Sequence, residues 1–173
     1  KRSGAWMSSF RDQSRAHGES LPVIVNNNNF AKAPDGVPTL LSADDVRTLF
    51  HEFGHGLHGL LSQVTYERLS GTHVLRDFVE LPSQLFEHWA FDPGVLERHA
   101  RHAETGEPIP HELVLRVRSA RRFNQGFETV EYAACALLDM ALHSSEGREG
   151  VDVAAFEAAE LARIGMPREI VLR

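Results

Sequence analysis

Three residues near the middle of the chain have the types and the spacing of a metal-dependent hydrolytic site. His51 and His55 are four residues apart, so on a helix of 3.6 residues per turn their imidazoles lie on one face, one turn apart. Two such imidazoles can converge on one zinc ion at Zn–N distances of about 2.0–2.1 Å. Glu52 borders the same face, in the position of a general base that acts on metal-bound water. The pattern predicts the catalytic zinc site of a peptide-hydrolysing enzyme.

The His-Glu-x-x-His pattern alone carries a risk of a chance match, because the chain contains 10 His. Composition alone would produce the pattern somewhere in such a chain with a frequency of roughly a few per cent, so the motif by itself is a hypothesis. Two further features strengthen it. The motif lies on an independently predicted helix, and a suitable third ligand follows it.

A catalytic zinc takes three protein ligands and keeps one position open for water. Position 61 is Leu, so the third His of the metzincin pattern is absent. A carboxylate on a second helix packed against the first would complete the site, and Glu80 fits this position best. The downstream residues with suitable side chains are His58, His73, Asp77, Glu80, Glu87 and His88.

Glu87 follows Glu80 by seven residues, on the same helical face but two turns away. It cannot bind the same metal unless the helix bends strongly at Pro82, so we interpret it as a residue that surrounds the ligands or lines the pocket. A third-ligand role for His58 and a solvated-loop role for His73 remain open alternatives. The candidates for the surroundings of the metal or for a substrate cleft are His58, Gly71, Thr72, His73, Asp77 and Glu87.

The helix that must carry the motif is predicted over residues 43–62, where apolar residues recur at steps of three and four. Ser42 has the position of the N-cap, and Asp45 that of its capping-box partner. Three glycines in this helix each weaken it by roughly 1 kcal/mol relative to Ala, so we expect it to pack closely against other elements there. They are Gly54, Gly56 and Gly59.

The other predicted elements are mostly helices, over residues 75–91, 94–104, 111–144 (one long helix or a pair) and 152–164. Pro82 should either kink the second helix or mark the first turn of its main segment. The β-branched run over residues 21–25 predicts a strand, and the Asn residues at 26–29 form either a loop or its continuation. The predicted core residues of the first two helices include Phe53, Leu61, Phe78, Leu85 and Trp89.

The composition is that of an ordinary globular domain: 173 residues, 42% hydrophobic and 24% charged. A net charge of −6 argues against nucleic acid or an anionic membrane as a partner, and no apolar run is long enough to span a bilayer. The single cysteine, Cys135, excludes an internal disulfide and is expected to be buried. We expect a cytoplasmic protein.

Several segments in the same order resemble the thimet-oligopeptidase family of zinc metallopeptidases, and within it the bacterial peptidyl-dipeptidase branch. The motif segment is Leu49-Phe50-His51-Glu52-Phe53-Gly54-His55 with His58. The other segments that carry the resemblance are Gly4-Ala5-Trp6-Met7, Leu69-Ser70-Gly71-Thr72, Arg76-Asp77-Phe78-Val79-Glu80-Leu81-Pro82-Ser83-Gln84 with Glu87-His88-Trp89, Phe123-Asn124-Gln125-Gly126-Phe127 and Leu137-Leu138-Asp139-Met140.

The resemblance implies a mainly α, zincin-like catalytic core with a short β-strand element near the N-terminus. It implies one Zn²⁺ per chain, held by His51, His55 and Glu80, with Glu52 as the catalytic glutamate. The Ser-Gly-Thr and Glu-His-Trp forms favour release of C-terminal dipeptides from oligopeptides. The alternatives are an oligoendopeptidase of the same family and a module that binds zinc but is catalytically incomplete.

The resemblance also implies that residues 1–173 are a single fragment of the metallopeptidase catalytic domain. The family has a large N-terminal helical part, and a downstream Gly- and Tyr-rich segment whose His and Tyr side chains help to bind substrate. Neither is found between Lys1 and Arg173. The remainder of the full-length peptidase is therefore an expected partner, alongside the oligopeptide substrate.

Overall fold

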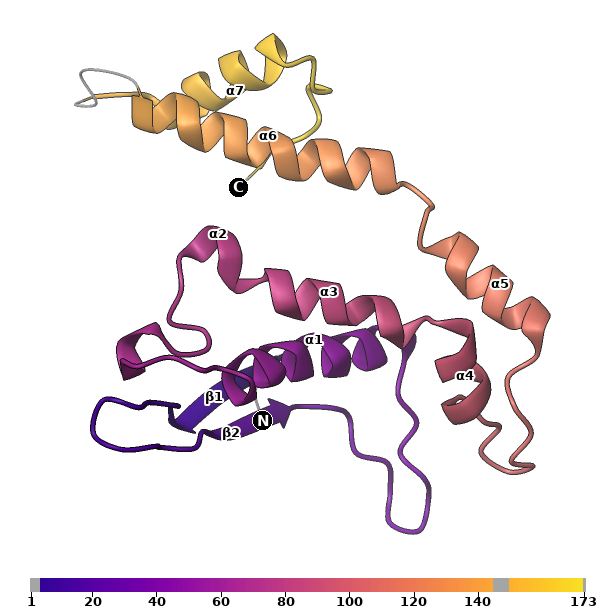
Figure 1. Ribbon diagram of the computed structural model, residues 1–173. Helices are drawn as coiled ribbons and strands as arrows, with labels where there is room; N and C mark the ends of the chain where they lie inside the picture. Colours follow the sequence, from indigo (N-terminus) through magenta and orange to yellow (C-terminus); the bar gives the residue numbers. More distant parts are fainter. Residues whose placement is uncertain (1–3, 145–149, 173) are drawn as a thin grey trace. The chain divides into compact units, whose positions relative to one another are not determined.

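The computed structural model describes residues 4–144 and 150–172 and confirms a mainly helical fold with a short β element near the N-terminus (Figure 1). The chain forms two compact units, Lys1–Leu115 and Arg116–Arg173. The elements are β1 (Ala5–Arg11), β2 (Val23–Asn28), α1 (Ala43–Leu60), α2 (Arg76–Val79), α3 (Leu81–Ala90), α4 (Pro93–His99), α5 (His111–Ala120), α6 (Gln125–Ser144) and α7 (Val153–Arg163).

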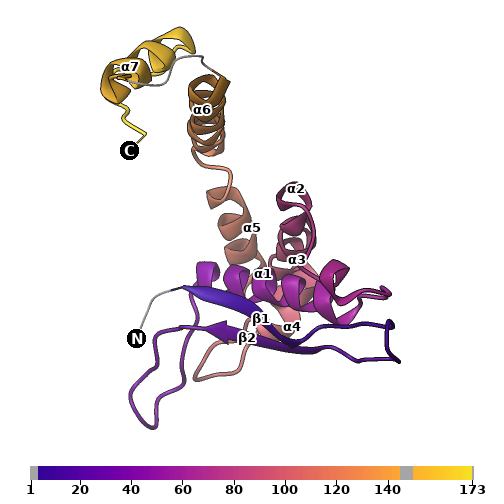
Figure 2. The ribbon, with the colours of Figure 1, turned by 90° about the vertical axis from the view of Figure 1, so that its left-hand side faces the viewer.

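In the first unit, α1 lies between the two-stranded sheet and α3, as Figures 1 and 2 show. Strands β1 and β2 are antiparallel, with Ala5 opposite Asn28 and Ser9 opposite Ile24. The sheet therefore covers one side of the motif helix, and α3 covers another. Residues of the sheet and of α3 can therefore contact α1 from different sides.

Helix α1 begins at the predicted cap. The Ser42 hydroxyl accepts a hydrogen bond from the Asp45 backbone N–H over 3.1 Å, and the Asp45 carboxylate accepts one from the Ser42 N–H over 3.0 Å. This reciprocal pair satisfies two of the donors that every helix start leaves unpaired. The helix ends at Leu60, two residues before the predicted end.

The glycines of α1 are sites of close approach, as the sequence predicted. A Cβ on Gly54 would lie 2.7 Å from the Ser83 Cα, and a Cβ on Gly59 would lie 2.7 Å from Ile24 Cδ1. Gly56 faces the Asn26 side chain. Because these positions lack a side chain, α1 can touch α3 on one side and β2 on the other.

The second predicted helix is two helices rather than one. Helix α2 ends at Val79, and α3 begins at Leu81 with Pro82 in its first turn, where a missing N–H costs nothing. Of the two roles considered for Pro82, the structure shows that of a first-turn residue. The third predicted helix stops at His99 rather than at 104, and the segment 111–144 is a pair.

Strand β1 was not predicted, because Ala and Ser are not among the strong strand formers and the residues that it pairs with lie 12 to 23 positions downstream. The Asn residues do continue β2, which extends to Asn28. Pairing across the sheet thus overrides the loop propensity of Asn in this segment.

Much of the predicted apolar core of α1 and α3 is exposed: Phe53, Leu61, Phe78, Leu85 and Trp89 all keep large accessible surfaces. The buried residues of α1 are instead Glu52, Gly54, His55, Gly56 and Gly59. The prediction was wrong here because the packed face of α1 is set by the glycines, which admit α3 and β2 at short range. The apolar stripe flanks that face, where Phe50 and Phe53 lie against Phe86.

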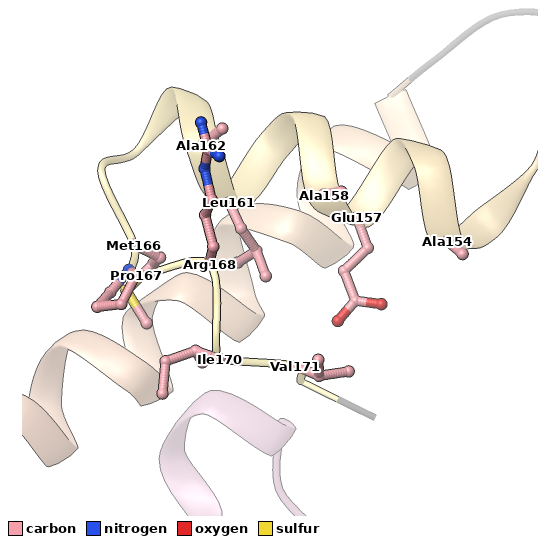
Figure 3. A pocket seen from close by; sticks show the side chains of 10 residues that line it. All are labelled: Ala154, Glu157, Ala158, Leu161, Ala162, Met166, Pro167, Arg168, Ile170 and Val171. Carbon is pink, nitrogen blue, oxygen red and sulfur yellow. The ribbon is translucent and has the colours of Figure 1, made fainter.

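In the second unit, α6 and α7 pack around Ala134, Leu161 and Met166. Glu157 lines a cavity of about 300 Å³ beside α7. Figure 3 shows its side chain with those of Arg168 and of the apolar residues Leu161, Ile170 and Val171 that also line this cavity. Glu157 Oε1 accepts a hydrogen bond from the Leu172 N–H over 2.8 Å, which holds the segment after α7 against that helix. Cys135 is exposed on α6, contrary to the expected burial.

None of the helices in residues 4–144 and 150–172 is both long enough and apolar enough to cross a bilayer.

Candidate metal centre

Helix α1 and the junction between α2 and α3 bring two imidazoles and one carboxylate close together. Oε2 of Glu80 lies 3.2 Å from Nε2 of His51 and 3.1 Å from Nε2 of His55. The three ligand atoms all lie within 4.8 Å of one another. The two imidazole rings meet edge to face, with their centroids 4.9 Å apart.

The size of this cluster fits a tetrahedral zinc site. Ligands at about 2.0–2.1 Å from a tetrahedral zinc are roughly 3.3 Å from one another, close to the two distances from Glu80 to the histidines. Two His nitrogens and one carboxylate oxygen are also a ligand set used by catalytic zinc. The residues present therefore fit the metal ion that the sequence predicted.

Glu87 approaches the first histidine from the side opposite to Glu80. Its Oε1 lies 2.7 Å from Nδ1 of His51. A carboxylate that is ionised only accepts hydrogen bonds, so with a metal bound at Nε2 the Nδ1 atom would carry the proton and donate it to Glu87. Glu87 thus lies beside a proposed ligand and outside the cluster of three ligand atoms.

Glu52 and the cluster open onto one cavity of about 330 Å³. Glu52 is 8% exposed, so packing restricts its carboxylate while leaving it access to this cavity. Strand β1 forms one wall and Thr72 contributes to the rim. The lining residues are Ala5, Trp6, Met7, His51, Glu52, His55, Thr72, Val79 and Glu80.

Four other candidate residues line neighbouring hollows. His58 and Gly71 border one of about 470 Å³ that reaches Trp89, and His73 and Asp77 border another of about 840 Å³. Since a helix rises 1.5 Å per residue, His58 lies beyond the cluster along α1, where its ring meets the edge of Phe78. Of the six candidates, the structure brings Thr72 and Glu87 to the cluster.

The pKa of His58 departs clearly from its ordinary value. Burial lowers the pKa of His58 below 6.5, and the nearby His55 lowers it further. Its Nδ1 atom is buried and has no hydrogen-bond partner within the described chain, and the same holds for Nδ1 of His55. His58 is therefore a neutral imidazole at pH 7.

Comparison with known proteins places this arrangement in a family. Residues 1–170 match the family described as Peptidase family M3. The chain belongs to peptidase family M3. This M3 chain is 52% identical over 165 residues to the dipeptidyl carboxypeptidase of Salmonella typhimurium, an alignment that covers 94% of the chain and 24% of that protein.

Two relatives from Escherichia coli, a dipeptidyl carboxypeptidase and an oligopeptidase A, can be compared with the chain. The M3 chain is 48% identical over 167 residues to a dipeptidyl carboxypeptidase, covering 96% of the chain and 24% of that protein. It is 40% identical over 147 residues to oligopeptidase A, covering 83% of the chain and 22% of that protein. The chain thus spans about a quarter of the length of these relatives, and the family resemblance seen in the sequence is confirmed.

Proposed function

We propose that this M3 chain carries the catalytic centre of a zinc metallopeptidase that releases C-terminal dipeptides from oligopeptides. The observation that supports this most directly is the convergence of His51, His55 and Glu80 beside Glu52 in one open cavity. Each chain would hold one zinc ion, through Nε2 of both histidines and a carboxylate oxygen of Glu80. With three protein ligands, the ion would keep one position open for water or substrate.

When bound, zinc polarises the scissile carbonyl and lowers the pKa of a water molecule that it binds from 15.7 to roughly 7. The Glu52 carboxylate takes a proton from the attacking water and delivers it to the nitrogen of the leaving amine. Its burial supports this role, since packing holds the carboxylate at the cavity wall. Glu87 keeps the His51 ring in one orientation and one tautomer through the Nδ1 hydrogen bond.

The relatives support the dipeptide-releasing branch over the endopeptidase branch. Identity is 52% and 48% to two dipeptidyl carboxypeptidases and 40% to an oligopeptidase A. The Ser70-Gly71-Thr72 turn that favoured this branch in the sequence contributes Thr72 to the rim of the cavity. Substrate residues near the scissile bond would therefore pass this turn.

The test is to load the 173-residue chain with zinc, add a short N-acetylated peptide and identify the products by mass spectrometry. Free dipeptides from the C-terminus, formed by the wild type and suppressed by a chelator, are the expected result. Glu52→Gln should retain zinc and lower the rate by about 10²–10⁴-fold, the usual contribution of general acid–base catalysis.

The alternatives give different products. An oligoendopeptidase would cut the same peptide at internal bonds, without stepwise loss of dipeptides. A chain that binds zinc and cleaves nothing would instead be a catalytically incomplete module. Turnover by Glu52→Gln at the wild-type rate would contradict the proposed mechanism.

A further inference from the structure

Glu80 is the ligand with the least support from packing. Its side chain is 48% exposed, and it lies at the junction between α2 and α3 rather than inside a helix. A carboxylate on an exposed side chain has several rotamers of similar energy. Something other than burial must hold it toward the two histidines.

Ser83 makes the contact that can do this. Its hydroxyl lies 2.7 Å from Oε2 of Glu80, the same oxygen that faces both imidazoles, and 2.9 Å from the Glu80 backbone oxygen. The hydroxyl has one hydrogen to donate. The carboxylate contact is the shorter one, and a hydrogen bond to an ionised acceptor is about twice as strong as one between neutral groups.

Ser83 is itself held rigidly. It is 0% exposed, and its Cα lies where a Cβ on Gly54 would approach to 2.7 Å. Gly54 directly precedes the ligand His55 on α1. The close approach of α1 and α3 at Gly54 therefore lies one residue before the ligand His55 on α1 and three residues after Glu80 in the chain.

We propose that Ser83 is a positioning residue for the metal site: its hydroxyl directs the Glu80 carboxylate toward His51 and His55, and the contact of Ser83 with Gly54 sets the separation of α1 and α3. This inference rests on the proposed function, in which Glu80 binds zinc. It assigns a role to a residue that does not touch the metal and that motif spacing did not single out.

A double-mutant cycle on zinc affinity tests the proposal. The dissociation constant for Zn²⁺ is measured, by competition with a chromophoric chelator, for the wild-type chain, Ser83→Ala, Glu80→Ala and the double variant. We expect Ser83→Ala to weaken zinc binding by about 10–100-fold, the range for residues that orient metal ligands. In the Glu80→Ala background, the same change should have no further effect, because the carboxylate through which Ser83 acts is gone.

Two variants control for packing. Ser83→Gly removes the same hydroxyl without adding an atom or a metal-binding group, and it should also weaken zinc binding. Ser70→Ala is the matched control, because Ser70 is 1% exposed and its hydroxyl has no partner among the described residues. It should leave the zinc affinity unchanged.

The outcomes separate this proposal from the proposed function. Equal loss of affinity from Ser83→Ala with and without Glu80 would show a purely structural role and overturn the proposal. Unchanged affinity in Ser83→Ala and Ser83→Gly, with a loss in Glu80→Ala, would overturn it while leaving the zinc site intact. A wild-type chain without zinc affinity, or a Glu80→Ala variant that binds zinc as tightly as the wild type, would overturn both.

Discussion

The Nδ1 atom of His51 lies 2.7 Å from Oε1 of Glu87, and this hydrogen bond joins the motif helix α1 to α3. Glu87 is seven residues beyond Glu80, and the two carboxylates meet opposite nitrogens of the same ring: Glu80 lies at Nε2 and Glu87 at Nδ1. With a metal bound at Nε2, Glu87 would hold the ring in the tautomer that carries its proton on Nδ1. Three predictions follow from this geometry and its neighbours.

Removal of the Glu87 carboxylate should weaken the metal site without removing a ligand. We expect Glu87→Ala to lower zinc affinity by about 10–100-fold, because His51 loses the acceptor that fixes its tautomer. Glu87→Gln should cost less, since the amide oxygen can still accept the Nδ1 hydrogen bond. Chelator competition measures both variants.

Glu97→Ala is the matched control for Glu87, because Glu97 is an exposed glutamate on α4. Its removal takes away the same charge and should leave zinc affinity unchanged. Equal affinities for the wild type and Glu87→Ala would show that the hydrogen bond does not orient His51.

Gly54→Ala should destabilise the fold despite the higher helix propensity of Ala. The new Cβ would lie 2.7 Å from the Ser83 Cα and 2.8 Å from the Pro82 carbonyl oxygen, and backbone atoms cannot move aside as a side chain can. Such overpacking costs about 1–3 kcal/mol. The free energy of unfolding in urea measures the effect.

Gly126→Ala is the control at a helical glycine that has open space around it. Gly126 lies in α6, and a Cβ there meets no heavy atom within 4 Å. Ala should therefore stabilise that helix by up to about 1 kcal/mol. If Gly54→Ala also raised stability, the close approach between α1 and α3 would be disproved.

His58 should make the stability depend on pH. Burial lowers the pKa of His58 below 6.5 in the folded chain, whereas the unfolded chain keeps the ordinary value. As the pH falls through 6.5, the unfolded state takes up a proton that the folded state does not, so the folded state loses stability. Above pH 6.5 His58 therefore takes nothing from the free energy of unfolding, and the loss appears only at lower pH.

The check is the difference in unfolding free energy between wild type and His58→Gln, both stripped of metal, over a series of pH values. The wild type should lose more stability than the variant as the solution becomes acidic. Parallel pH profiles would contradict the prediction, because they would mean that His58 takes up its proton equally in both states.

Residues close together in the chain were predicted well, because their geometry follows from one helix. The placement of His51 and His55 on one face, the cap at Ser42 and the first-turn position of Pro82 in α3, one of two roles predicted for it, all depend on a few adjacent residues. Strand β1 and the exposed apolar side chains of α1 and α3 were not predicted. Both depend on segments that are distant in the sequence, because those segments decide which surfaces of a strand or helix are covered.

By itself, the sequence determined the types of the ligands and the helix that carries two of them, since an i, i+4 pair converges whatever the rest of the chain does. It also proposed Glu80, 25 residues after His55. Only the tertiary structure brought Glu80 Oε2 to within 3.2 Å of both imidazoles and set Ser83 behind it. The physical reason is the contact at Gly54, where the absence of a side chain lets α3 approach α1 closely enough for one carboxylate to meet two histidines.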